Sequence, residues 1–197
     1  MKVGITGGMG SGKTTVCQIF EELNIPVYYA DTEAKKLMTK NKSVKSEIKK
    51  LLSADSYFRN GRPNRPFISS KVFSNKALLD KLNQIIHPAV HDDFDLFYQQ
   101  HNKTAPFVLN EAALLVENGS YHRFDALIVV TCPESIRIER IMKRDKVGKD
   151  IVLRRLENQL PEEAKIKHAS YIIDNDGQHP LLPQVWKIYQ TLLKMNK

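Results

Sequence analysis

The chain has 197 residues, a formal net charge of +8 and two cysteines, Cys17 and Cys132, a length that allows one ordinary domain or a core with an inserted subdomain. The cysteines match no metal or redox spacing, no apolar run is long enough to span a membrane, and the N-terminus enters a predicted strand directly, so we expect buried thiols in a cytoplasmic protein. The basic charge favours polyanionic partners without choosing among them.

A glycine-rich segment at residues 7–14, GGMGSGKT, follows the first predicted strand and opens into helix-like sequence. It matches G-x-x-x-x-G-K-[ST], the phosphate-binding P-loop. Its backbone amides can face phosphate oxygens at the positive end of the following helix. We expect Lys13 to reach the β- and γ-phosphates of a nucleoside triphosphate and the Thr14 hydroxyl to ligate Mg²⁺. The nucleotide-binding residues predicted from this loop are Gly8, Gly10, Ser11, Gly12, Lys13, Thr14 and Thr15.

Apolar, strand-like runs recur along the chain, each followed by a helical or loop-plus-helical segment. They are Val3–Thr6, Val27–Ala30, Phe107–Asn110, Leu127–Thr131 and Tyr171–Asp174. Alternating strands and helices indicate a parallel sheet with helices on both faces. The predicted fold class is α/β, a P-loop NTPase three-layer sandwich with a five-stranded parallel sheet, a helical acceptor-binding insertion and a helical lid.

The insertion fills the gap between the second and third strands. Its helical patterns are Thr32–Lys40, Ser43–Leu52, Lys71–Ile86 and Ala89–Gln100, with a loop at residues 60–66. His87-Pro88 should break or kink the helices around it, because proline lacks the backbone N–H. A helical insertion on a P-loop core usually holds the acceptor substrate, so we expect that role here.

An arginine-rich helix is predicted after Pro133. Its spacing puts Arg137, Arg140 and Arg144 on one face, and a second helix with Arg154 and Arg155 follows a polar turn. We favour a lid closing over phosphates; the alternative is a salt-bridged surface hairpin.

The predicted domain is single, residues 1–197, with a core of residues 1–31, 106–136 and 168–197, an acceptor region of residues 32–105 and a lid of residues 137–167.

Other P-loop classes fit less well. No Asn-Lys pair has Asp two positions later, which disfavours a GTPase. The third strand ends in Asn110-Glu111, where a nucleic-acid ATPase would show Asp-Glu, so that class is a weaker alternative. A small-molecule or nucleotide kinase needs a carboxylate after the second strand, and Asp31 stands there. Asp31 can accept the proton of the acceptor hydroxyl or orient that hydroxyl for attack, although the position equally suits a helix N-cap.

Further segments follow the P-loop in a specific order. They are Ala30-Asp31 with Ala34, Arg65 before Val72-Phe73, Leu82 to His87-Pro88, Leu114–Glu117, Arg140, Arg144-Asp145, Arg155–Gln159, and Ala169 to Asn175 followed by Gly177. This set resembles the dephospho-CoA kinase family over nearly the whole chain. The resemblance implies transfer of the γ-phosphate of ATP to the ribose 3′-hydroxyl of dephospho-coenzyme A, giving coenzyme A and ADP, the last step of coenzyme A biosynthesis.

Carried over by position, the resemblance makes Asp31 the catalytic base or orienting carboxylate. Lys13 and Arg140 would neutralise the transferring phosphate, with Arg144 as a further ATP-binding candidate. Arg65 and His87 would lie near the acceptor, and Asn175 near the adenine. For His87 a capping role before the proline is as plausible, and for Asn175 a turn role after the last strand.

The resemblance also implies Mg²⁺ as cofactor, ATP and dephospho-coenzyme A as substrates, no nucleic-acid or membrane partner, and a monomer or small homo-oligomer. Three positions depart from the family pattern. Tyr29 stands where a second Asp is frequent, and Asn110 and Ala113 stand where Asp and Pro are common. Because Asn110 supplies no negative charge, its part in holding Mg²⁺ is open, as is that of Glu111. A nucleoside monophosphate or sugar kinase is the alternative within kinases.

Overall fold

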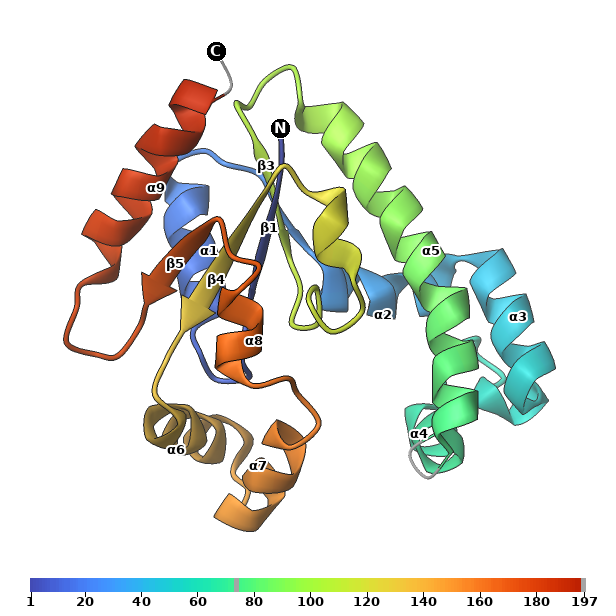
Figure 1. Cartoon of the computed structure of the whole chain (residues 1–197). Helices are drawn as coiled ribbons and strands as arrows, with labels where there is room; N and C mark the ends of the chain where they lie inside the picture. The colour runs from blue at the N-terminus through green and yellow to red at the C-terminus, as the bar shows by residue number, and fades with distance from the viewer. Residues whose placement is uncertain (73–74, 196–197) are drawn as a thin grey trace. The chain divides into compact units, whose positions relative to one another are not determined.

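The computed structural model describes residues 1–72 and 75–195. They divide into two compact units (Figure 1). The first, here called the core unit, comprises Met1–Tyr29 and Tyr98–Lys197, and the second, the helical unit, comprises Ala30–Phe97.

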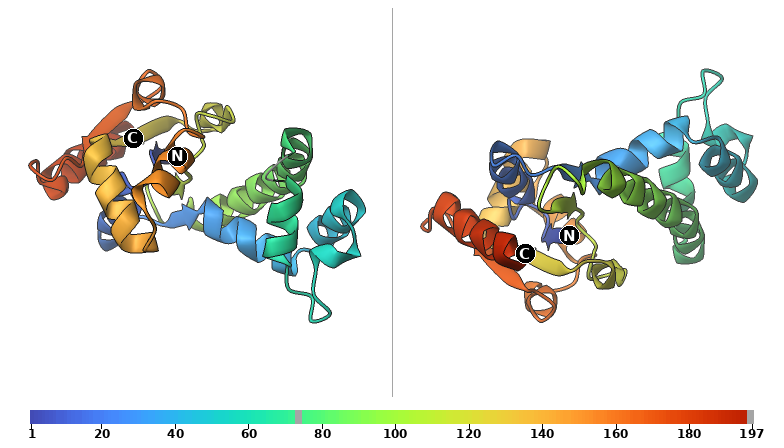
Figure 2. Two further views of the ribbon diagram at one scale, coloured as in Figure 1. Left: turned by 90° about the horizontal axis from the view of Figure 1, so that it is seen from below. Right: turned by 90° about the horizontal axis from the view of Figure 1, so that it is seen from above.

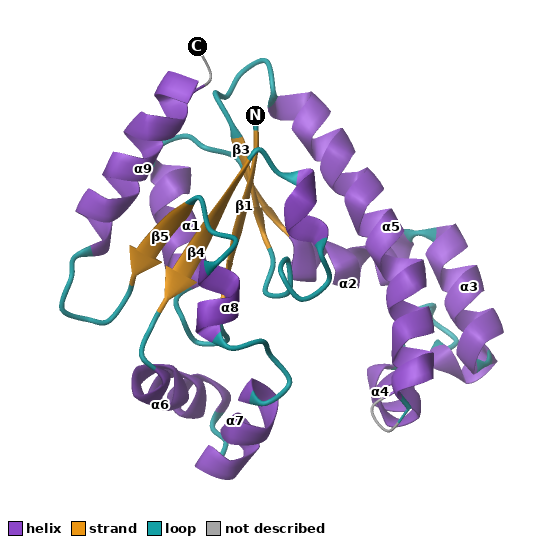
Figure 3. Cartoon of the chain, viewed as in Figure 1, coloured by secondary structure: helices purple, strands orange, loops and turns teal. Residues whose placement is uncertain are grey.

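A five-stranded parallel sheet in the order β2-β3-β1-β4-β5 forms the centre of the core unit (Figure 3). The strands are β1 (Lys2–Gly7), β2 (Val27–Tyr29), β3 (Val108–Glu111), β4 (Ala126–Thr131) and β5 (Tyr171–Asp174). β1 is central: Ile5 is in register with Glu111 of β3 and with Ile128 of β4. The predicted parallel sheet is confirmed, and each predicted strand lies within one or two residues of an observed one.

The sheet is covered on both faces. Alternation along each strand sends successive side chains to opposite faces. One face, with Val3 and Ile128 fully buried, packs against helices α1 (Lys13–Glu22) and α9 (Leu181–Met195), which can be followed in Figures 1 and 2. The other face, with Leu127 and Val129, packs against the segment after β3 and α8 (Glu162–Ile166). The predicted α/β sandwich is therefore confirmed.

A helical hairpin follows β4. It consists of α6 (Glu134–Asp145) and α7 (Lys149–Leu156). The remaining short helix of the core unit is η2 (Ser120–Arg123). No helix among residues 1–72 and 75–195 has the combination of length and apolarity that crossing a bilayer needs.

The helical unit has its own core. Its helices are α2 (Ala30–Lys40), α3 (Lys42–Leu52), η1 (Ala54–Ser56), α4 (Arg65–Val72) and the greater part of α5 (Lys76–His101). The buried residues that pack together are Val44, Ile48, Tyr57, Ile68, Val72 and Leu82. Burial raises the pKa of Tyr57 to about 12, and its hydroxyl donates to the Met38 carbonyl at 2.9 Å.

The sequence predicted a break or a kink at His87-Pro88. The break is wrong, because α5 runs through Pro88 as one helix, and the kink stays a prediction. A helical proline costs the hydrogen bond to the carbonyl four residues earlier, here that of Gln84. Gln84 is exposed, so water can satisfy that carbonyl, while Leu82 and Val90 are buried on either side of the proline. Packing on both sides outweighs the local rule. Phe73 and Ser74, within the predicted helix Lys71–Ile86, lie outside the described residues.

Candidate active site: the P-loop and its surroundings

The P-loop connects β1 to α1, as predicted. Gly10 and Gly12 have φ angles of 79° and 92°, a region that residues with a Cβ rarely occupy. Gly12 is the N-cap of α1, and the Ser11 amide donates to the Gly8 carbonyl at 3.1 Å. The loop thus curls back at the positive end of a helix, which is the geometry of an anion site.

Lys13 is held over this loop. It is 8% exposed, and its Nζ donates to the Gly7 carbonyl at 3.0 Å and to the Gly8 carbonyl at 3.3 Å. Thr14 and Thr15, in the first turn of α1, are exposed. The ammonium group is therefore positioned at the loop by the chain itself, and the two hydroxyl-bearing residues are accessible to a ligand.

α6 packs against the first half of the loop through Arg137. A Cβ at Gly8 would lie 2.0 Å from Nη1 of Arg137, so a larger residue at position 8 requires this guanidinium to move. The Arg137 side chain is 12% exposed and pairs with Glu134 at 3.6 Å, while its buried Nε has no hydrogen-bond partner among the described residues. The predicted site did not include Arg137, although its spacing from Arg140 already put both on one face.

Asn175 closes the second half of the loop. Its Nδ2 donates to the Ser11 carbonyl at 2.7 Å, and a Cβ at Gly12 would lie 2.1 Å from that nitrogen. Nη2 of Arg140 lies 3.4 Å from both the carbonyl and the Oδ1 of Asn175, and Nη1 of Arg140 lies 3.4 Å from the Cys132 Sγ. Residues predicted from distant motifs, Arg140 and Asn175, therefore meet beside the P-loop.

Arg144 has a different environment. Its Nε donates to Asp145 at 2.7 Å and its side chain is 63% exposed. The same carboxylate accepts from Arg155 of α7 at 2.7 Å, and hydrogen bonding by Arg144 holds the pKa of Asp145 below its ordinary value. Asp145 thus ties α6 to α7. The three arginines that share a helix face in sequence have three separate partners.

The end of β3 contributes oxygen atoms. Asn110 is 5% exposed, and its Oδ1 has no hydrogen-bond partner among the described residues. Glu111 is 8% exposed. Burial, and secondarily the charge of Glu111, raise the pKa of the Cys17 thiol in α1, whereas Lys13 lowers it. Glu111 therefore acts within electrostatic range of α1, and both cysteines are buried as predicted.

The segment after β3 is fixed by a buried ion pair. Lys165 of α8 has a side chain only 1% exposed, and its Nζ pairs with Glu117. The Nζ also lies 3.4 Å from the Ala113 carbonyl, which accepts from the Thr6 hydroxyl at 3.2 Å. This pair anchors the chain immediately following Asn110-Glu111.

A group of possible metal ligands lies at the end of β5 and in the turn that follows it. Asp174, Asp176 and His179 each offer an atom within 4.8 Å of the others. Asp176 Oδ1 accepts from the amides of Gln178 and His179, and its Oδ2 lies 2.9 Å from Nδ1 of His179. These bonds account for the cluster as an Asx-type turn without a metal.

The predicted acceptor residues belong to the helical unit. Asp31 is exposed in the first turn of α2. Because α2 begins at Ala30, Asp31 lies inside the helix, which contradicts the N-cap alternative. Arg65 is exposed at the first residue of α4. His87 is half-buried within α5, so its proposed capping role is also wrong, and burial lowers its pKa.

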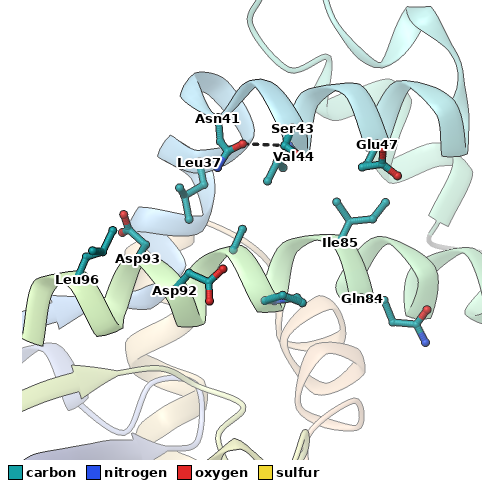
Figure 4. Close-up of a pocket in the computed structure, with 12 residues that line it drawn as sticks. Leu37, Asn41, Ser43, Val44, Glu47, Gln84, Ile85, Asp92, Asp93 and Leu96 are labelled. Carbon is teal, nitrogen blue, oxygen red and sulfur yellow. Dashed lines mark hydrogen bonds between the residues drawn. The ribbon is translucent and has the colours of Figure 1, made fainter.

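A cavity of about 490 Å³ lies within the helical unit (Figure 4). Its apolar lining includes Leu37 and Ile85, and Asn41 caps α3 beside it by accepting from the Val44 amide at 3.1 Å. Three carboxylate residues also line it: Glu47, Asp92 and Asp93. This acidic lining makes the cavity unsuitable for a pyrophosphate.

The chain is similar to known proteins over most of its length. A family model described as dephospho-CoA kinase matches residues 1–180. A dephospho-CoA kinase of Leptospira interrogans is 38% identical over 192 residues, 97% of this chain and 92% of that protein. A crystal structure of a Thermus thermophilus protein superposes with a TM-score of 0.83 at 31% identity, covering 97% and 96% of the two chains. The dephospho-CoA kinase of Campylobacter jejuni superposes with a TM-score of 0.73 at 27% identity over both whole chains.

Proposed function

The chain belongs to the dephospho-CoA kinase family, and from this premise we propose that it transfers the γ-phosphate of ATP to the ribose 3′-hydroxyl of dephospho-coenzyme A. The hydroxyl oxygen forms a bond to the γ-phosphorus as the bond from that phosphorus to the β,γ-bridging oxygen breaks. The products are coenzyme A and ADP, and the hydroxyl proton passes to a protein carboxylate.

The observation that carries this proposal is the preformed P-loop. Lys13 Nζ lies on the Gly7 and Gly8 carbonyls at the start of α1, from where its charge can follow the γ-phosphate during transfer. Arg140, at the Asn175 end of the loop, supplies a second positive charge. Phosphoryl transfer requires positioning and charge neutralisation more than covalent chemistry, and these two side chains meet that need.

The residues beside the P-loop fit a magnesium ion. Mg²⁺ prefers oxygen ligands, and the exposed hydroxyl of Thr14, the unpartnered Oδ1 of Asn110 and the buried carboxylate of Glu111 are of that type. We propose that Thr14 holds the ion directly. Bound Mg²⁺ would neutralise charge on the β- and γ-phosphates.

Asp31 is the proposed base or orienting carboxylate, and Arg65 and His87 are the proposed acceptor contacts. The acceptor region would comprise residues 32–105, the lid residues 137–167, and the core residues 1–31, 106–136 and 168–197. Arg144 would contact ATP only after exchanging its present partner, Asp145. Asn175 is proposed to lie beside the adenine while it holds the Ser11 carbonyl. We further propose a cytoplasmic protein, monomeric or a small homo-oligomer, that acts on nucleotides rather than nucleic acid or membranes.

An acceptor screen tests the proposal. Purified protein with ATP and Mg²⁺ is offered dephospho-coenzyme A, AMP, simple sugars and single-stranded nucleic acid, and ADP release is measured. We expect ADP release with dephospho-coenzyme A, and coenzyme A carrying the new phosphate at the 3′ position. If AMP or a sugar is phosphorylated in preference to dephospho-coenzyme A, the proposed acceptor is wrong. Nucleic-acid-stimulated hydrolysis with a steep salt dependence would identify an ATPase instead.

A further inference from the structure

Gln159 reaches the P-loop from the segment that follows α7. Its Oε1 accepts a hydrogen bond from the Met9 amide at 2.8 Å, across 150 positions of sequence. Met9 is the third residue of the P-loop. Gln159 ends the segment Arg155–Gln159, on which the family resemblance partly rests, and it is not among the predicted site residues. The backbone N–H of Met9, in the P-loop, is therefore hydrogen-bonded to a side chain of this protein.

Both ends of this contact are attached to the α6–α7 hairpin. The Gln159 amide donates to the Leu156 carbonyl at 2.9 Å, so its backbone continues the end of α7. The Met9 side chain packs against an apolar cluster on the hairpin, which includes Ile141 of α6 and Val152 of α7. Met9 is thus attached to the hairpin by its backbone and by its side chain.

A cavity adjoins Gln159. It has a volume of about 760 Å³ and is lined by Gln159, Arg137 and residues of α7 and α8. An open space of this size leaves room for the segment after α7 to shift. The hydrogen bond from the Met9 amide and the packing of the Met9 side chain together hold this segment at the P-loop.

Two side-chain amides therefore hold the loop from outside. Asn175 donates to the Ser11 carbonyl in the second half, and Gln159 accepts from the Met9 amide in the first half. Lys13 bonds to the carbonyls of Gly7 and Gly8, directly before Met9. A displacement of Met9 would move the carbonyls that position the lysine.

We propose that Gln159 is a positioning residue: by holding the Met9 amide, it fixes the curvature of the P-loop's first half and couples the α6–α7 hairpin to Lys13. It acts through the loop and does not touch the reacting atoms. The coupling to Lys13 rests on the proposed function, whereas the hold on the Met9 amide does not.

The test uses Gln159→Met, which keeps the length of the side chain and removes the acceptor, and Gln159→Glu, which keeps an acceptor oxygen. Hydrogen exchange of the Met9 amide is measured by NMR on the full-length protein without nucleotide. We expect exchange to accelerate about tenfold or more in Gln159→Met, and protection to persist in Gln159→Glu. Equal exchange in wild type and Gln159→Met, or equal loss in both variants, would overturn the hold on Met9.

Steady-state kinetics with ATP and dephospho-coenzyme A test the coupling. For Gln159→Met we expect kcat to fall about tenfold, with the KM for dephospho-coenzyme A changed by less than about twofold, because the acceptor contacts are elsewhere. The matched control is Asn158→Ala, whose exposed side chain bonds to the Arg154 carbonyl at 2.8 Å and which should retain wild-type kcat. An unchanged kcat in Gln159→Met refutes the coupling. Inactive wild type with a protected Met9 amide would refute the proposed function and leave the hold on the loop intact.

Discussion

The predicted site residues of the two units differ in how they are held. In the core unit, Lys13 and Asn175 are buried and hydrogen-bonded to the P-loop backbone. In the helical unit, Asp31 and Arg65 are exposed at helix starts. The phosphate-binding side is thus organised by the chain before any ligand arrives, while the proposed acceptor side presents charged side chains to water.

This difference has an energetic meaning. Preorganised donors and charges cost little reorganisation when the transition state forms, so the P-loop should contribute to both nucleotide binding and rate. Exposed side chains must lose rotamer freedom when a ligand binds them. We therefore expect substitutions in the core unit to disturb nucleotide binding together with rate, and substitutions in the helical unit to disturb catalysis or acceptor binding alone.

The largest expected effect comes from Lys13→Ala. Loss of the ammonium group should lower turnover about 1000-fold and also weaken ADP binding, because the same nitrogen organises the loop carbonyls. Coupled-assay kinetics and calorimetric ADP titration measure the two effects. Lys50→Ala, at an exposed lysine of α3 that pairs with Glu47, is the control and should behave as wild type. If turnover falls strongly while ADP binding is intact, the expectation that core-unit substitutions disturb both is wrong.

Asp31→Asn should lower kcat about 100-fold, within the usual range for a general base, and leave ADP binding unchanged. Asparagine keeps the size of the side chain in the first turn of α2. Steady-state kinetics and the same titration check this expectation. The control is Glu33→Gln, an acid of the same turn that pairs with Lys36. Near-normal turnover of Asp31→Asn would mean that Asp31 only supports the helix start through the macrodipole.

The smallest effect concerns pH and His87. Burial lowers the pKa of folded His87 below its ordinary value of 6.5, so below that pH the unfolded chain binds more protons than the folded one. Stability should therefore be fully present above pH 6.5 and decline as pH falls through the lowered pKa. Urea unfolding from about pH 7.5 to about pH 5 should show a shallower decline for His87→Gln than for wild type. Parallel curves would mean that His87 is not the group responsible.

The sequence predicted the core unit better than the helical unit. Buried parallel strands such as β4 are continuous apolar runs, and their limits follow from composition alone. The helix through Pro88 could not be found in this way, because local proline chemistry and tertiary packing oppose each other there and packing prevails. The start of α2 at Ala30, one residue before Asp31, could not be predicted either, because local sequence defines helix limits only to within one or two residues.

At the site, sequence identified the P-loop, Arg140 and Asn175, but not the contacts by which the loop is supported. Helical spacing placed Arg137, Arg140 and Arg144 on one face, yet it could not say that the first covers Gly8 and the last pairs with its neighbour Asp145. Asn175 and Gln159 contact the loop across 164 and 150 positions. Contacts of that range depend on the complete fold, and local pattern carries no information about them.

The buried pair of Lys165 and Glu117 has an evolutionary consequence. Replacing one member strands the other charge in the interior, at a cost of about 3–5 kcal/mol, whereas replacing both with apolar residues of similar volume is often neutral or stabilising. Single substitutions at either position should therefore be purged, and viable descendants should change both sites in concert. Among divergent relatives, we expect these two columns of an alignment to covary as charged–charged or apolar–apolar.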